Sequence, residues 1–147
     1  MHGFCLVCAR VLFSIGLMLR NESSGAMAAS GAPALAGEPL DRHQLEKFIK
    51  GWFVGRFDPT LISTDAVEVA IKHYRAGDHE EEHHHKVATE LTAVVSGRVQ
   101  MSGEEFGPGE IVRIKPGRST DFKALTDATT VVVKMPCVAG DKYMGRA

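Results

Sequence analysis

The residues best suited to chemistry lie in one short stretch, 77–97, which reads GDHEEEHHHKVATELTAVVSG. Four of the seven histidines fall between His79 and His85, and Glu90 follows them. His83 and His85 are two residues apart, so on an extended strand their imidazoles project from the same face. Two imidazoles and a carboxylate that converge on one point form a divalent-metal site, suited to Fe, Mn, Ni, Cu or Zn, with open positions for water or substrate. The alternative is a solvated, charged loop.

The spacing of these residues resembles the first motif of the cupin superfamily, which is Gly, five residues, His-x-His, three or four residues, Glu, six residues and Gly. Here the fixed positions are Gly77, His83, His85, Glu90 and Gly97. The resemblance implies an all-β fold, the double-stranded β-helix or cupin jelly-roll barrel, with a metal or small ligand near its mouth. It also implies that His83, His85 and Glu90 bind the metal, and that Glu90 either stays on it or leaves it to act as the catalytic base.

The second motif of the superfamily is incomplete in this chain. It reads Gly, five residues, Pro-x-Gly, two residues and His. Gly109 and Gly117 match, Pro116 is shifted by one place, and Thr120 stands where the last metal-binding histidine is expected. A hydroxyl is a much poorer metal ligand than an imidazole. Three interpretations remain open: the two histidines and the glutamate bind the metal alone, Asp121 rotates in through a local bulge as a further ligand, or the barrel has lost its metal.

Length and composition exclude several classes of protein. The chain has 147 residues, 44% hydrophobic and 24% charged, which is ordinary for one globular domain. Its formal net charge of −1 gives no basis for nucleic-acid binding, which usually shows as a strong basic excess. Cys5, Cys8 and Cys137 form no regular disulfide framework. A structural zinc site made of Cys5, Cys8 and the histidine cluster is a weaker interpretation, since Leu and Val inside the CxxC suit neither a zinc knuckle nor a redox turn.

Residues 1–40 do not share the pattern of a barrel. Their apolar run, 11–19, lies between Arg10 and Arg20 and is too short to cross a bilayer core, which takes roughly 20 residues. The segment is either a disordered lead-in or mis-called start of a cytoplasmic protein, or the signal peptide of a secreted one with a cleavage site at 26–28. We expect the first, and no membrane span.

Residues 41–57 are expected to form a short helix followed by an aromatic arm. Asp41 and Gln44 have the spacing of a capping box, which predicts a helix over Asp41–Lys50. The arm either packs its rings on the outside of the barrel or contributes to a homodimer contact, because Trp and Phe are favoured at the centres of interfaces. Its rings belong to Trp52, Phe53 and Phe57.

We expect the barrel to occupy residues 58–147. From Asp65 the hydrophobicity alternates with a period of two, which predicts a half-buried strand whose apolar face carries Val67, Val69, Ile71 and His73. His73 then either faces the interior near the metal or is a hydrogen-bonded core residue, while Glu80–Glu82 form a solvated rim. After Glu90, glycine-rich corners recur about every ten residues, as is typical of a sandwich or barrel.

Two classes of function fit these features. One is a metal-dependent enzyme acting on a small organic molecule, and dioxygenase, isomerase and decarboxylase chemistry all suit the ligand set. The other is a non-catalytic small-molecule-binding or sensor protein with weak or no metal, favoured by the hydroxyl at position 120. We expect a small-molecule partner, no nucleic acid and no membrane. Because cupins commonly pair, we also expect a homodimer.

Overall fold

Ten strands form two five-stranded sheets in the computed structural model, which describes residues 40–147. The first sheet has the order β1-β2-β9-β4-β7 and the second β10-β3-β8-β5-β6. The strands are β1 (Trp52–Val54), β2 (Glu68–Tyr74), β3 (His79–His84), β4 (Thr89–Ser96), β5 (Val99–Met101), β6 (Glu104–Phe106), β7 (Ile111–Ile114), β8 (Thr120–Ala124), β9 (Ala128–Met135) and β10 (Tyr143–Met144). The two expectations for the N-terminal segment and for Cys5 and Cys8 lie outside the described residues.

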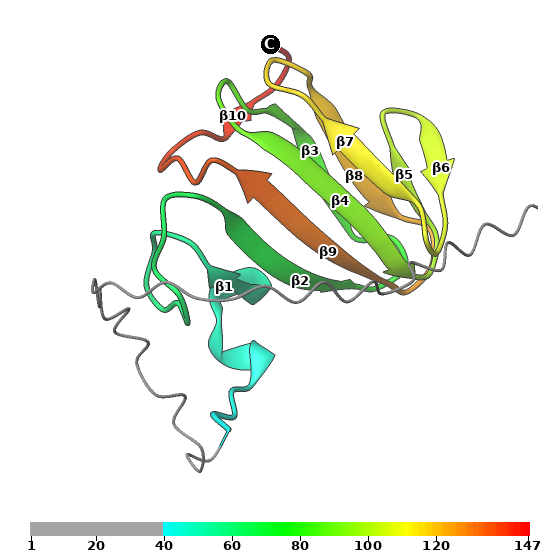
Figure 1. The fold of residues 1–147 in the computed structure, drawn as a ribbon. Helices are drawn as coiled ribbons and strands as arrows, with labels where there is room; N and C mark the ends of the chain where they lie inside the picture. Colours follow the sequence, from blue (N-terminus) through cyan, green and yellow to red (C-terminus); the bar gives the residue numbers. More distant parts are fainter. Residues whose placement is uncertain (1–39) are drawn as a thin grey trace, which may run out of the picture. The chain divides into compact units, whose positions relative to one another are not determined.

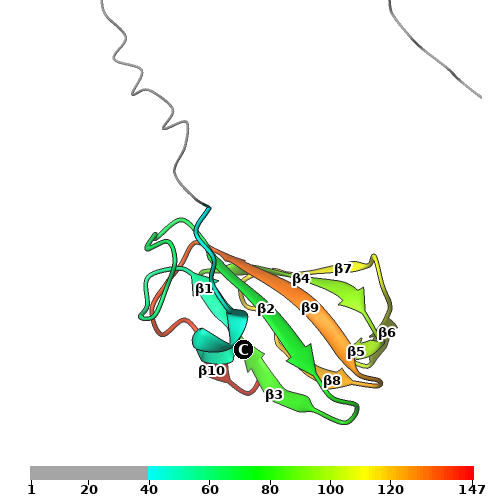
Figure 2. The same ribbon diagram turned by 90° about the horizontal axis from the view of Figure 1, so that it is seen from below.

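The chain passes back and forth between the two sheets. From β3 onward each strand lies in the sheet opposite its predecessor, apart from β6, which pairs with β5 as a hairpin. All of the paired strands run antiparallel. In Figures 1 and 2 the sheet of β2, β9 and β4 faces the sheet of β3, β8 and β5 across the interior. The predicted all-β jelly-roll barrel is therefore confirmed.

The segment before the barrel differs from the expected helix. Two 3-10 turns, Leu45–Lys47 and Ile49–Gly51, replace a single helix over Asp41–Lys50, and the side chain of Gln44 makes no capping hydrogen bond. Phe48 is extended between the turns (φ −102°, ψ 134°), and its ring packs edge-on against Phe53 with the centroids 6.4 Å apart. The extended residue Phe48 thus divides the segment into two short turns where one helix was expected.

The inward face of β2 carries charges, contrary to the sequence-based expectation. The expected alternation is present, but the faces are exchanged: Glu68 and Ala70 are buried, while Val69 is only half-buried on the opposite face. His73 is exposed, and its Nδ1 lies 3.0 Å from the hydroxyl of Thr129, so neither expected role of His73 in the interior is correct. The inward charges are tolerated because each is paired inside the barrel.

Along β4 the inward side chains change from polar to apolar. Glu90 and Thr92 come first and Val94 follows, and antiparallel β9 beside it begins with buried Ala128 and ends near Lys134. A cluster of buried residues fills most of the space between the sheets beyond the polar positions: Val94, Val99, Met101, Ile114, Phe122, Ala124 and Ala128. The polar ends of the same strands surround a cavity.

Candidate metal centre

A β-bulge in β3 turns the ligand candidates toward the interior. Glu80 pairs with Phe122 and His83 pairs with Thr120, so three steps along β3 match two along β8. The extra residue lets both Glu80 and His83 face inward, although they are an odd number of positions apart. His84 takes the opposite face, where its ring stacks on that of Tyr143 with the centroids 5.4 Å apart.

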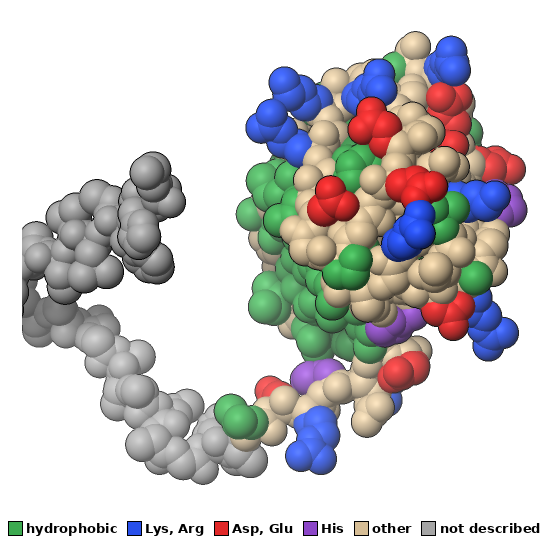
Figure 3. Space-filling model, turned by 90° about the vertical axis from the view of Figure 1, so that its right-hand side faces the viewer, with side chains coloured by type: hydrophobic (Ala, Val, Ile, Leu, Met, Phe, Trp, Pro, Cys, Tyr) green, Lys and Arg blue, Asp and Glu red, His purple; other side chains and the backbone are tan. Residues whose placement is uncertain are grey.

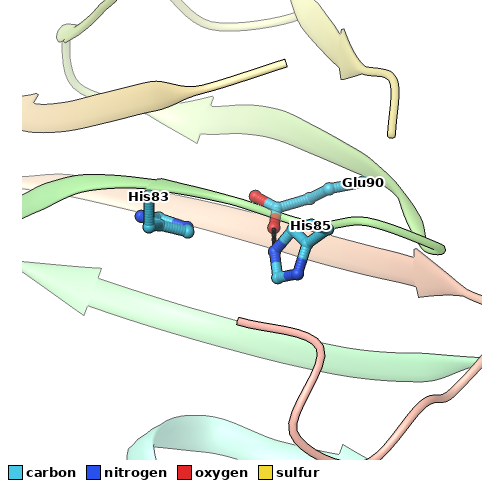
Figure 4. Close-up of side chains that lie close together, drawn as sticks. All are labelled: His83, His85 and Glu90. Carbon is cyan, nitrogen blue, oxygen red and sulfur yellow. Dashed lines mark hydrogen bonds and ion pairs between the residues drawn. The ribbon is translucent and has the colours of Figure 1, made fainter. Parts of the chain in front are cut away.

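His83, His85 and Glu90 come together as the spacing of the sequence predicted. One possible ligand atom from each lies within 4.8 Å of the others. His83 and His85 are 6% and 3% exposed. Glu90 is the second residue of β4 and reaches the histidines from the facing sheet. Figure 4 shows the Glu90 carboxylate turned toward the ring of His85, with His83 beside them. The cluster is therefore held by both sheets of the barrel.

Backbone carbonyls fix the orientation of both imidazole rings. His83 Nδ1 donates to the carbonyl of Glu81 at 2.9 Å, and His85 Nδ1 donates to the carbonyl of Asp141. These bonds leave Nε2 of each ring as the atom available to a metal, in the arrangement that carbonyl partners commonly impose on ligating histidines.

His85 lies between two hydrogen-bond acceptors. Besides the carbonyl of Asp141 it faces the carboxylate of Glu90, with Nε2 3.2 Å from Oε2. A neutral imidazole has one N–H and can satisfy only one of them, so the second contact requires either a proton or a cation. Two imidazole nitrogens and a carboxylate oxygen have the donor chemistry of a divalent transition-metal site, so the residues fit such an ion.

The surroundings shift the pKa values of the three residues in different directions. The hydrogen bond with Glu90 raises the pKa of His85, whereas burial lowers the pKa of His83. Burial acts to raise the pKa of Glu90, but hydrogen bonds from His85 and Thr92 outweigh it, and the pKa falls below its ordinary value. Glu90 is thus an anion near neutral pH, as a metal ligand must be.

Thr120 and Asp121 do not complete a four-ligand set. Thr120 is buried beside His83, but its hydroxyl donates to the carbonyl of Asp121 at 3.0 Å and accepts from Ser102 Oγ at 3.1 Å. Asp121 is exposed on the outer face of β8 and accepts a hydrogen bond from the amide of Ser102 at 2.7 Å. The expectation that Asp121 joins the cluster is therefore not met, because strand alternation turns it away.

The cluster opens into a cavity of about 950 Å³ that is lined with charged groups. Lys72 Nζ lies 2.7 Å from Glu80, which also accepts from the hydroxyl of Tyr74 at 2.8 Å and from Lys142 Nζ at 3.1 Å. Burial acts to raise the pKa of Glu80, but Lys72 outweighs it and the pKa falls to about 2. Contrary to the expected solvated rim, Glu80 therefore lies inside as a permanent anion.

Sequence reasoning missed these lining residues for different reasons. Lys72 and Tyr74 lie on the same face of β2 as Glu68, and the large aliphatic residues between them, Val69 and Ile71, indicated the opposite face as the inward one. The charged side chains at alternate positions, Glu68 and Lys72, were the feature of the sequence that could have identified the inward face. Asp141 lies 51 residues beyond Glu90 in sequence, and no motif connects the two.

Comparison with family profiles and with curated protein sequences finds no match. Solved structures do match. A conserved protein with a double-stranded β-helix domain from Klebsiella pneumoniae shares 21% identity over 59% of this chain and 81% of its own, with a TM-score of 0.53. The chain has the cupin fold.

Two further solved structures are similar to the barrel of this chain. The DMSP lyase DddQ from Ruegeria pomeroyi shares 15% identity over 70% of this chain and 59% of its own, with a TM-score of 0.52. YhhW from Escherichia coli shares 14% identity over 67% of this chain and 42% of its own, also with a TM-score of 0.52. At these identities the likeness concerns the fold alone. Between residues 40 and 147, no helix of the protein is long and apolar enough to cross a membrane.

Proposed function

We propose that the protein is a metal-dependent cupin-type enzyme that acts on a small organic molecule, with His83, His85 and Glu90 as its metal ligands. The observation that carries the proposal is the convergence of three ligand atoms within 4.8 Å at the wall of a large cavity. A buried cluster of this kind, beside space for a ligand, is the usual form of a catalytic metal site.

The ligands have distinct tasks in this proposal. His83 and His85 bind through Nε2, and their Nδ1 bonds to carbonyls keep the rings from rotating. Glu90 either remains a ligand or takes up a proton from substrate at a carboxylate oxygen. The metal would supply a Lewis acid that polarises a substrate oxygen. Dioxygenase, isomerase and decarboxylase chemistry all remain compatible with this arrangement.

The charged groups within a mainly apolar lining favour a substrate that carries a polar group on a carbon skeleton. Two ammonium groups, those of Lys72 and Lys142, share the single carboxylate of Glu80. Lysine carries three N–H donors, so both retain donors for a ligand. Apolar rings, including Phe122 and Trp52, line the same cavity and can pack against the carbon skeleton of a small molecule.

A second function, a non-catalytic binding or sensor protein, is favoured by Thr120. Its hydroxyl already bonds to Asp121 and Ser102, so it offers no strong ligand at the fourth position. Fewer protein ligands weaken metal binding, and a barrel with a weakly held metal can still bind a small molecule in its cavity.

Metal analysis followed by a turnover screen separates the two functions. We expect about one metal per chain in the purified protein, and conversion of an oxo acid, catechol or sugar that stops with a chelator. His83→Ala and His85→Ala should each abolish stoichiometric binding, whereas His73→Ala should not, because His73 is an exposed histidine outside the cluster. Bound metal without turnover supports the binding protein. Unchanged metal content in both His83→Ala and His85→Ala would contradict the proposed metal site.

A further inference from the structure

Asp141 is a buried acidic residue outside the three proposed ligands. It lies in the C-terminal segment between β9 and β10 and is 6% exposed. Among residues 40–147 its carboxylate makes no ion pair with a lysine or arginine; the titratable group near it is His85, whose Nδ1 lies 4.0 Å from Oδ2. A carboxylate buried in this way needs hydrogen-bond donors to offset its desolvation.

Those donors are three consecutive backbone amides. Oδ1 accepts from Lys86 N at 2.9 Å, and Oδ2 accepts from Val87 N at 3.1 Å and from Ala88 N at 2.8 Å. These three residues belong to the connection between His85 and Glu90. The side chain of Asp141 thus holds the turn that sets the separation of two proposed ligands.

The main chain of Asp141 acts on the same ligand pair. Its carbonyl accepts the hydrogen bond from His85 Nδ1, which selects the tautomer with Nε2 free. One residue, from a distant part of the sequence, therefore restrains the ring of His85 and the path of the chain to Glu90.

We propose that Asp141 is a positioning residue of the metal centre, which it organises by clamping the 86–88 turn and by presenting its carbonyl to His85. The proposal rests on the proposed function, because it takes His85 and Glu90 to be metal ligands. Carbonyl and carboxylate partners of ligating residues commonly change metal affinity by about 10–100-fold when they are removed.

The C-terminal segment has other anchors, so removal of the carboxylate need not release it. Tyr143 and Met144 pair with β3, Gly145 N donates to the carbonyl of Glu82 at 2.7 Å, and Lys142 contacts Glu80. A variant at position 141 can therefore remain folded with its segment in place while the 86–88 turn is freed.

The experiment measures Co²⁺ affinity and the visible spectrum of the Co²⁺-loaded full chain. We expect Asp141→Ala to weaken binding by about tenfold or more and to alter the spectrum, with an unchanged far-ultraviolet circular dichroism spectrum. Asp141→Asn retains one acceptor oxygen and should lie between wild type and the alanine variant. The matched control is Asp127→Asn, because Asp127 also caps a distant backbone amide, that of Ala76 at 2.8 Å, but outside the cluster.

A second measurement keeps this proposal separate from the proposed function. Nitrogen NMR of the metal-free protein at about pH 8.5, above the ordinary histidine pKa, reports the tautomer of His85. We expect Nδ1–H in wild type and Asp127→Asn. Asp141→Ala keeps the carbonyl at position 141, but the freed 86–88 turn lets the His85 ring move away from it, so we expect a mixture of tautomers there. If wild type binds no Co²⁺, the proposed function fails and the tautomer alone decides the role of Asp141. Wild-type affinity in a folded Asp141→Ala, an unshifted tautomer, or equal weakening by Asp127→Asn and Asp141→Asn would each overturn the positioning role.

Discussion

At the scale of single residues, the position of His85 between two acceptors links the site to pH. Its pKa is raised, chiefly by Glu90, so in the metal-free protein its proton stabilises the fold below about pH 6.5 and this stabilisation is lost as the pH rises through the raised pKa. Metal binding has the opposite dependence, because the imidazole must lose its proton to bind.

We therefore predict that metal occupancy falls as the pH drops, beginning above about 6.5. His85 should be the first ligand to protonate, because the pKa of His83 is lowered by burial and its ring stays neutral to lower pH. Equilibrium dialysis against limiting metal between about pH 5 and pH 8, followed by metal analysis, measures the curve. Full occupancy at the acidic end would contradict the role of His85 as a ligand.

The residue at position 120 should control affinity. Thr120 is buried opposite His83, where an imidazole would supply a further nitrogen donor. We predict that Thr120→His tightens metal binding by about tenfold, or ~1.4 kcal/mol, in a calorimetric titration. Asp121→Ala is the control and should leave affinity unchanged, because its side chain faces outward. If the aspartate variant alone lost metal, Asp121 would belong to the site after all.

At the scale of elements, the sequence predicted what repeats locally and missed what depends on distant partners. The prediction that His83 and His85 lie together is correct because they are close neighbours in sequence, and the spacing of the motif identified Glu90 as their partner. The inward face of β2 was misassigned because Val69 and Ile71 lie on an outer surface, while the charges of Lys72 and Glu68 find partners only in other strands. No local pattern contains such pairing.

A substitution in the turn between β4 and β5 tests how closely this turn, at the end of the strand that carries Glu90, packs against its neighbours. Gly97 has a φ of +78°, and a Cβ there would overlap the carbonyl oxygen of Asp127 next to β9. We predict that Gly97→Ala lowers the free energy of unfolding by about 2–5 kcal/mol, since it adds a backbone penalty to a steric one. Chemical denaturation measures the change.

Gly103→Ala is the matched control for this turn. Gly103 also has a positive φ, +83°, but a Cβ there meets nothing within 4 Å. It should cost only the backbone penalty, about 1–2 kcal/mol. Equal losses in the two variants would show that the overlap with Asp127 is relieved by movement of the strand.

At the scale of the whole molecule, the outer face of the first sheet is apolar. Strand register places two cross-strand rows on it, and in Figure 3 hydrophobic side chains gather along the edge of the domain that this sheet occupies. Ile111, which belongs to one of these rows, is 66% exposed, and Val95, near the end of β4 and outside both rows, is 55% exposed. The rows consist of Ile71, Val131, Ala93 and Ile111, and of Val69, Val133, Leu91 and the charged Arg113.

The aromatic arm is less available for an interface than its composition suggested. Trp52 lines the cavity, and its ring lies 4.7 Å from Lys134 Nζ and 5.6 Å from Lys72 Nζ. Its edge meets Phe57 with the centroids 6.4 Å apart. Because these contacts occupy the ring of Trp52 within the chain, the open sheet face is a better candidate than the arm for the expected homodimer contact.

We propose that the protein forms a homodimer through this face, because a sheet surface of two mainly aliphatic rows, with its charge confined to Arg113 on the edge strand β7, is best covered by an identical one. Val131 lies at its centre, paired with Ile71 on one side and Ala93 on the other. Val131→Lys should therefore convert a dimer into a folded monomer in light scattering at micromolar concentration, since two lysines would meet across the twofold axis without partners. Lys123→Glu, an exposed change on the second sheet, should leave the dimer intact. A monomeric wild type would contradict the homodimer, and a dimer that persists in Val131→Lys would return the contact to the arm.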